Sequence, residues 1–544
     1  MNILAIIPAR GGSKGIPRKN IRLISGKPLI SYSIDCALHS KYNLDVVVST
    51  DDEEITGIAE LQNVEVINRP SKLATDDVTL DPVIYHSTLK LESYKTKKYD
   101  MVITMQPTSP LLCSSTLDCA IEYFLAQKLD TLISGINRPH LSWNESSSGV
   151  VPNYKYRLNR QELPKHLEET GAFVISKREC IKEDSRIGQN ISIFELSDRE
   201  AIDIDTPQDW WIAEKELSKK MILIRTDGYS KIGLGHIYRG LLLAYNLIEH
   251  DIKFIISKKS DIGIEKIKQS HFNYDVIDTD IEIVDKINEY QADILINDIL
   301  DTSQEYIVSC KNTGVKVINF EDLGTGAQHA DIVINDLYEK RNEYKNHFWG
   351  SDYYCIRDEF LLASPYKFNP KVDEVLVLFG GTDPCDLTLK TLQAINNLSN
   401  KTIKYTFILG MGYQKSEELY NEVQKSNMNI ELVHDVKRMT EYMQKADLAL
   451  SSQGRTMLEL ASMEVPTILL AQNEREKHHS FGYLENGFIN LGLGSTVNEN
   501  TIKETLLWLI KSPQIRKQMM EQMRKKDLKN GINRVKDLIL TDYK

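Results

Sequence analysis

The chain has 544 residues, 41% of them hydrophobic and 26% charged, and this length predicts several packing units that each bury a core of their own. No apolar run approaches the roughly 20 residues that span a bilayer, and the net charge of -11 is opposite to the basic excess of general nucleic-acid binders. The first residues lead into a glycine-rich loop and not into a secretion signal. We therefore expect a cytoplasmic multidomain protein that has neither nucleic acid nor a membrane as partner and binds small anions.

The first part of the chain alternates short β-branched runs with longer amphipathic segments. This alternation predicts strands joined by crossover helices, and hence an α/β domain with a mainly parallel sheet. The expected strands cover 2–9, 44–51, 99–106 and 130–137, and the clearest expected helices cover 28–40 and 79–93.

The same alternation restarts twice further along the chain. A helical segment ends near residue 218, and Met221 then opens a new run of strands like the start of a once-separate chain. A stretch at 360–374 with two prolines resembles a hinge between two lobes. We expect three domains, at 1–218, 219–368 and 369–544, all of the α/β class. The further expected strands cover 221–228, 251–258, 292–299, 315–322 and 330–337, then 374–384, 405–412, 431–435, 446–452 and 467–472.

A glycine-rich loop, "IIPARGGSKGIPRKN" at 6–20, follows the first expected strand. A strand that feeds such a turn points backbone N–H groups at one spot, and Arg10, Lys14, Arg18 and Lys19 add positive charge around it. The spacing matches neither the P-loop nor the dinucleotide-binding pattern. The loop is therefore either a triphosphate site or a solvated basic turn.

Six motifs in order decide between these alternatives. They are "PARGGSKGIPRKN", "GKPLISYSI", "RPSKLATDD", "QPTSPLL", "RQELP" and "DIDTPQD". Over residues 1 to about 218 the chain resembles the CMP-sialic acid synthetase (acylneuraminate cytidylyltransferase) family. The resemblance implies a Rossmann-like, glycosyltransferase A-like nucleotidyltransferase that moves CMP from CTP to a nine-carbon acidic sugar, releases pyrophosphate, requires Mg²⁺ and commonly forms homodimers. A cytidylyltransferase for 3-deoxy-octulosonate is the main competing interpretation.

Attack on the α-phosphorus of CTP builds negative charge that cationic side chains can stabilise. The expected catalytic residues are Arg10, Lys14 and Lys19, with Gly11, Gly12 and Ser13 binding phosphate through the loop. Asp203 and Asp205 alternate along a strand-like segment, so both carboxylates could hold Mg²⁺. Asp205 could instead cap the helix that begins near Pro207.

The resemblance also assigns residues around the substrates. It places Asn20 and Arg69 near the nucleotide, and Gln106, Arg160 and Gln161 near the sugar. Thr170 stands where the family more often has asparagine, so the sequence leaves sialic, legionaminic and pseudaminic acids all open as substrate.

A second glycine loop, "RTDGYSKIGLGHIYRG" at 225–240, precedes an amphipathic helix and places His236 at the helix start. The positive end of the helix dipole disfavours imidazolium there and leaves the ring free to act as a base. A capping or packed histidine is the structural alternative.

Residues 221–490 resemble the UDP-sugar hydrolase family of pseudaminic acid synthesis and related predicted glycosyltransferases of spore-coat polysaccharide formation. The matching pieces are "RTDGYSKIGLGHIYR", "FGGTDP" and "SSQGRTMLELASMEVPTILLAQNEREKHH". The resemblance implies a two-lobed, glycosyltransferase B-like fold that binds UDP mainly through its later lobe. His236 would activate water. Asp227 and Asp298 would orient His236 or the sugar, or would cap loops, and Glu459 would contact the ribose hydroxyls. The expected UDP-sugar contacts are Gly233, Gly235, Gly380, Gly381, Thr382, Gly454, Thr456 and Glu459.

Together the two resemblances predict a bifunctional enzyme of nonulosonic acid synthesis. The second half would release a free diacetamido sugar, a separate synthase would convert it into the acid, and the first half would activate that acid. Two alternatives stay open for the second half: a glycosyltransferase of surface polysaccharide synthesis, and a non-catalytic sugar-nucleotide-binding module.

Overall fold

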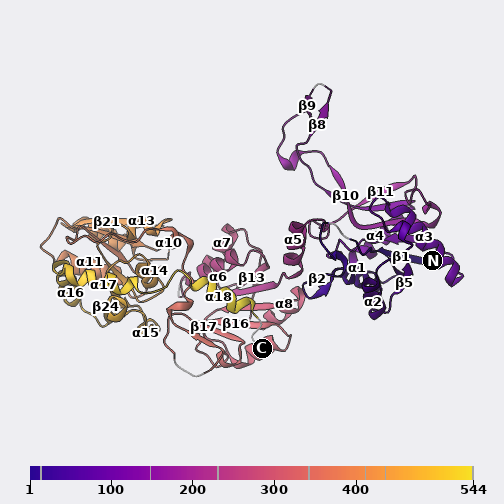
Figure 1. The fold of residues 1–544 in the computed structure, drawn as a ribbon. Helices are drawn as coiled ribbons and strands as arrows, with labels where there is room; N and C mark the ends of the chain where they lie inside the picture. The colour runs from indigo at the N-terminus through magenta and orange to yellow at the C-terminus, as the bar shows by residue number, and fades with distance from the viewer. Residues whose placement is uncertain are drawn as a thin grey trace. The chain divides into compact units, whose positions relative to one another are not determined.

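The computed structural model describes residues 1–12, 15–147, 149–229, 232–340, 344–410, 412–434 and 436–541. The chain divides into two compact units, Met1–Lys219 and Lys220–Lys544. Figure 1 shows the first unit from indigo to magenta and the second from magenta to yellow. No helix among the described residues is both long enough and apolar enough to cross a membrane.

The first unit is built around one twisted sheet. Parallel strands β1, β4, β5 and β6 form one side, while β10 runs antiparallel between β6 and β7. The strands lie in the order β11 (Ile191–Glu195), β7 (Thr131–Asn137), β10 (Leu167–Lys177), β6 (Met101–Thr104), β1 (Ile3–Pro8), β4 (Leu44–Thr50) and β5 (Glu65–Asn68). The helices are α1 (Leu29–Leu38), α2 (Glu53–Leu61), α3 (Leu80–Lys95), α4 (Ser114–Ala126) and α5 (Pro207–Leu217).

Alternate residues of β1 supply two separate cores. Ile3, Ala5 and Ile7 pack with α1, α2 and α4, whereas Leu4 and Ile6 pack with α3 on the opposite face. Because successive strand side chains point to opposite faces, a strand buried on both faces is apolar at every position, as β1 is. This layered arrangement is a Rossmann-like nucleotidyltransferase fold.

Two small hairpins complete the first unit. One pairs β2 (Leu23–Ile24) with β3 (Lys27–Pro28), and the other pairs β8 (Trp143–Ser146) with β9 (Gly149–Pro152). The β8–β9 hairpin projects from the rest of its unit in Figure 1, and the described residues of both strands are exposed.

The first lobe of the second unit contains a fully parallel sheet. Ile222 and Ile224 of β12 pack with α6, α7 and α18, whereas Leu223 packs with α8 and α9. The strand order is β14 (Tyr274–Ile277), β13 (Asp251–Ser257), β12 (Met221–Thr226), β15 (Ile294–Asp298), β16 (Lys316–Phe320), β17 (Ile332–Asn335) and β18 (His347–Trp349). The helices are α6 (Gly235–Asn246), α7 (Asp261–Gln269), α8 (Glu282–Tyr290), α9 (Gln304–Lys311) and α18 (Gly531–Leu540).

The second lobe repeats this plan. Val375 and Val377 of β19 pack with α11, α12 and α16, and Leu376 and Leu378 pack with α10, α13, α14 and α17. The strand order is β21 (Asn429–His434), β20 (Lys404–Leu409), β19 (Glu374–Leu378), β22 (Leu448–Ser452), β23 (Thr467–Ala471) and β24 (Phe488–Leu493). The helices are α10 (Asp358–Leu362), α11 (Leu387–Asn396), α12 (Ser416–Lys425), α13 (Met439–Met443), α14 (Thr456–Ser462), α15 (Glu474–Lys477), α16 (Glu499–Lys511) and α17 (Pro513–Arg524).

The last helix departs from the expected division at residue 369. Ile532, Val535 and Ile539 of α18 are buried in the core of the first lobe, so the chain crosses back at its end. The crossing passes close to the segment between the lobes, because a Cβ on Gly531 would lie 2.0 Å from the carbonyl oxygen of Tyr354. The second unit is thus a two-lobed, glycosyltransferase B-like module whose lobes are joined at two places.

A buried arginine fixes the segment between the lobes. Arg516 of α17 is fully buried and donates to the carbonyl oxygens of Leu509, Asn369 and Pro370 at 3.1, 2.9 and 2.6 Å. Arg516→Met would leave the carbonyls of Asn369 and Pro370 without this donor, and that of Leu509 with only the backbone N–H of Ser512 at 3.2 Å. We expect the variant to lose about 2–4 kcal/mol of unfolding free energy, measured by urea denaturation. Lys517→Met, at the exposed neighbouring position, should change it by less than about 0.5 kcal/mol, and equal losses in both would contradict this role.

Candidate active sites

In the first unit, Lys19 binds the segment that carries both predicted metal ligands. Its ammonium group donates to the carbonyl oxygen of Ile204 at 2.7 Å and lies 3.3 Å from Oδ1 of Asp205. This segment is irregular where the sequence predicted a strand, and Thr206, not Asp205, caps α5 through a capping box with Asp209. The carboxylate of Asp205 is therefore left largely exposed beside Lys19.

Asp203 is held against the backbone of the sheet. Its Oδ1 atom is buried without a hydrogen-bond partner among the described residues, and a Cβ on Gly171 would lie 2.8 Å from its Oδ2 atom. Burial raises the pKa of Asp203, and the nearby charge of Asp205 contributes to the rise. A nearby cation stabilises the ionised form of such a carboxylate, because it replaces the lost interaction with water.

The two aspartates fit a Mg²⁺ site of the open kind. Mg²⁺ is usually held by one or two carboxylates together with water and substrate phosphates. Across the described ranges, no cluster of three or more Asp, Glu, His or Cys side chains is arranged to hold a metal. At a site of this kind, water and substrate phosphates would supply the other ligands.

Several other predicted residues lie around the carboxyl ends of β1, β4 and β5. The guanidinium of Arg10 lies 2.6 Å from Oδ1 of Asp76, and Asn20 donates to the carbonyl of Arg10 at 3.0 Å. Arg69 is buried, donates to the carbonyl of Ser49 at 2.7 Å, and has no partner for Nε among the described residues. Burial lowers the pKa of Arg69 to about 10. The positions of Gly11 and Gly12 are described in the same loop, whereas Ser13 and Lys14 lie outside the described residues.

The residues predicted to contact the sugar do not gather at one place in the first unit. The backbone N–H of Gln106 donates to the carbonyl of Gly171 at 3.3 Å, beside Asp203. Arg160 and Gln161 are exposed on a short 3-10 helix, and their side chains have no hydrogen bond or ion pair within the described ranges. Thr170 is buried and donates to the hydroxyl of Ser134 at 2.9 Å, so its side chain belongs to the β7–β10 pair and not to an open pocket.

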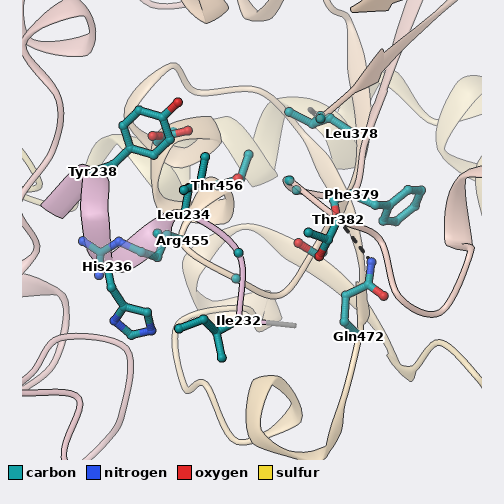
Figure 2. A pocket seen from close by; sticks show the side chains of 18 of the residues that line it. Ile232, Leu234, His236, Tyr238, Leu378, Phe379, Thr382, Arg455, Thr456 and Gln472 are labelled. Atoms are coloured by element: carbon teal, nitrogen blue, oxygen red, sulfur yellow. Dashed lines mark hydrogen bonds between the residues drawn. The ribbon is translucent and has the colours of Figure 1, made fainter. Parts of the chain in front are cut away.

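In the second unit, a cavity of about 430 Å³ lies between residues of the two lobes. Figure 2 shows His236 and Tyr238 on the side of α6, opposite Thr382 and Gln472 of the second lobe. All the predicted UDP-sugar contacts line this cavity: Gly233, Gly235, Gly380, Gly381, Thr382, Gly454, Thr456 and Glu459. His236 lines it as well.

His236 is oriented by a buried carboxylate. Its Nδ1 atom lies 2.5 Å from Oδ1 of Asp298, which follows from their places at the start of α6 and the end of β15. Arg239, one turn along α6, donates to both oxygens of Asp298 at 2.7 and 2.5 Å. Burial opposes ionisation, but Arg239 and His236 lower the pKa of Asp298. An anionic carboxylate can only accept a hydrogen bond, so it orients the neutral ring with the hydrogen on Nδ1 and the lone pair on Nε2.

A buried charge cluster continues from Arg239 into the second lobe. Arg239 donates to Glu321 at 2.6 Å, and Arg455 of the second lobe donates to Glu321 and Asp336 at 3.0 and 3.2 Å. Against the effect of burial, the two guanidinium groups lower the pKa of Glu321. The cluster thus joins the loop at Gly454 to the histidine site through paired, buried charges.

Asp227 follows its loop-capping alternative, and Glu459 is bonded to an arginine. Asp227 accepts from the backbone N–H of Ser257 at 3.0 Å and pairs with Arg225 at 2.8 Å, so it fixes its loop and does not reach His236. Glu459 accepts from Arg357 at 2.8 Å, and one of its oxygens is therefore already engaged at the cavity wall.

The sequence analysis missed several cavity residues. Arg239 lies three positions after His236, a helical spacing that places both on one face and could have revealed it. Arg455 lies inside a quoted motif, but its acidic partners are more than 100 residues away. Glu476 and His479 lie in the segment "QNEREKHH", where spacing alone gives no chemical signal.

Comparison with known proteins gives two family matches. Residues 4–173 match the family described as Cytidylyltransferase, and residues 375–535 match the Glycosyltransferase family 28 C-terminal domain. Among solved structures, MurG of Acinetobacter baumannii aligns with 59% of this chain and 99% of its own at 14% identity and a TM-score of 0.46.

Three relatives are similar to different parts of the chain. An uncharacterized protein of Methanocaldococcus jannaschii is 28% identical over 48% of this chain, which spans only 58% of that protein's length. Pseudaminic acid cytidylyltransferase of Campylobacter jejuni is 34% identical over 38% of this chain and 93% of its own. CMP-N,N'-diacetyllegionaminic acid synthase of Legionella pneumophila is 33% identical over 41% of this chain and 100% of its own. The cytidylyltransferase match and these nearly full-length alignments show that the chain belongs to the cytidylyltransferase family.

Proposed function

We propose that the first unit transfers CMP from CTP to a nonulosonic acid and releases pyrophosphate. The proposal rests chiefly on the Asp203 carboxylate, whose Oδ1 atom is buried without a hydrogen-bond partner among the described residues, in the segment that also carries Asp205 beside Lys19. The relatives that act as pseudaminic and legionaminic acid cytidylyltransferases support the substrate class.

Each side chain of this site has a role in the proposed transfer. Arg10 and Lys19 bind the phosphates and stabilise the charge that develops as pyrophosphate leaves. Arg69 keeps an Nε–H that has no partner among the described residues, and it would donate to the nucleotide. Asp203 and Asp205 would hold Mg²⁺, which neutralises phosphate charge when bound.

The first experiment is incubation of the full chain with CTP, Mg²⁺ and, separately, sialic, legionaminic and pseudaminic acids. We expect pyrophosphate release and a CMP-sugar of the matching mass with one of these acids. Absence of product with all of them, in a protein that still binds CTP, would contradict the proposed substrate class.

We further propose that the second unit hydrolyses a UDP-linked diacetamido-trideoxy sugar. The observation that carries this proposal is the 2.5 Å contact between His236 and Asp298 at the cavity. In the proposed reaction, Nε2 of His236 removes a proton from water, the water oxygen bonds to the anomeric carbon, and the bond from that carbon to UDP breaks. The products are the free sugar and UDP. A separate synthase would then convert the sugar into the acid that the first unit activates.

A second candidate is glycosyl transfer to a surface-polysaccharide acceptor, favoured by the match of residues 375–535 to a glycosyltransferase domain. Mass spectrometry of products separates the two, because hydrolysis yields free sugar without any acceptor. Rapid release of UDP and free sugar would support hydrolysis. Turnover only after an acceptor is added would support transfer, and UDP-sugar binding without turnover in either condition would support a binding module.

A further inference from the structure

A second histidine lines the cavity from the other lobe. His479 is 5% exposed, and its Nδ1 atom lies 2.6 Å from the carbonyl oxygen of Gln453. A carbonyl oxygen can only accept a hydrogen bond, so Nδ1 must carry the proton. In the neutral ring, Nε2 is therefore a bare acceptor, and it has no partner among the described residues.

The surroundings of His479 hold the ring neutral and in place. The side-chain amide of Gln453 donates back to the carbonyl of His479 at 2.7 Å, and the ring of Tyr338 packs edge-on at 5.0 Å between centroids. Burial lowers the pKa of His479, although Glu321 opposes this effect. The charged groups that act on it are Glu321 and Arg455 of the interlobe cluster, and Arg475 of α15.

His479 lies at the seam between the lobes, where it contacts Gln453, the residue before Gly454. The next residue, Ser480, donates its backbone N–H to the carbonyl of Leu337 in the first lobe at 3.0 Å. His236 and His479 both line the cavity, the first from α6 and the second from the other lobe.

We propose that Nε2 of His479 accepts a hydrogen bond from the sugar of the bound nucleotide sugar, either from a hydroxyl or from an acetamido N–H, and thereby favours the sugar nucleotide over the bare nucleotide. The proposal rests on the proposed UDP-sugar site of the second unit. A nearly buried acceptor strongly favours a ligand that brings a donor. The diphosphate carries no hydrogen-bond donor at neutral pH. Each sugar of the proposed class carries hydroxyl or acetamido N–H donors.

The test compares the binding of UDP and UDP-N-acetylglucosamine, as a UDP-acetamido sugar, by calorimetry with the full chain. The proposal predicts that the wild type binds the sugar nucleotide more tightly than UDP. His479→Phe keeps a ring of similar size but removes the acceptor, and should reduce this preference by about fivefold to tenfold with little change in UDP affinity. His479→Gln carries an amide oxygen as an alternative acceptor and should retain part of the preference.

His478→Phe is the matched control, because His478 is the exposed neighbour and does not line the cavity. It should leave both affinities unchanged. Three outcomes would overturn the inference. The wild type could show no preference for the sugar nucleotide, or His479→Phe could keep the wild-type preference. The third is that His479→Phe melts like the wild type but loses affinity for UDP and for the sugar nucleotide equally. If the wild type binds neither ligand, the proposed UDP-sugar site itself fails, which is a separate outcome.

Discussion

Replacing His236 with glutamine is expected to lower kcat for release of UDP from a UDP-diacetamido-trideoxy sugar by about 10²- to 10⁴-fold. The glutamine amide can still donate to the carboxylate of Asp298, but it cannot take a proton from water. KM should change little, because most of the cavity wall stays intact. The measurement is steady-state UDP release, with His434→Gln as a control at an exposed site on the second lobe.

The same variant separates the functions proposed for the second unit. A large loss of kcat with retained UDP-sugar binding would support His236 as the base for either water or an acceptor hydroxyl. A kcat equal to that of the wild type would mean that another group removes the proton. In that case the 2.5 Å contact between His236 and Asp298 serves packing and not catalysis.

The fold could be predicted wherever a strand is buried on both faces. Ile3–Pro8 is apolar along its whole length, Met221–Thr226 is apolar over its first four residues, and each becomes a central strand. The prediction missed Leu167–Lys177, because its pairing with β7 is interrupted by a bulge between Glu169 and Val174. It also missed short edge strands such as Tyr274–Ile277, whose half-exposed residues lack a clear pattern.

Some features of the candidate sites could likewise be predicted from the sequence, and others could not. Glycine loops and His236 are local features, because a strand, a tight turn and a helix start lie within about 15 residues of sequence. The partners that give the cavity its charge come from distant segments: Arg239 and Asp298 are 59 residues apart, and Arg455 and Glu321 are 134 apart. No spacing rule joins such pairs, since only the packed lobes bring them together.

Asp203→Asn is expected to reduce CMP transfer by the first unit by about 10²-fold or more, because the amide keeps the shape but cannot neutralise a cation. Two readouts apply: pyrophosphate release, and calorimetric CTP binding with and without MgCl₂. The variant should lose the Mg²⁺-dependent part of CTP affinity. Asp198→Asn, at an exposed position, should leave both readouts unchanged.

The Asp203→Asn substitution should raise the stability of the protein although it lowers CMP transfer. Because burial and the charge of Asp205 raise the pKa of Asp203 in the folded state, folding favours the protonated carboxyl. Wild-type stability should then fall as pH rises from the unfolded-state pKa through the raised folded-state pKa, and the Asp203→Asn variant should lack this step. We expect the variant to melt at a higher temperature than the wild type at pH 7 without ligand. A lower melting temperature together with full activity would mean that the buried carboxylate stabilises the fold, and that the metal, if required, is held elsewhere.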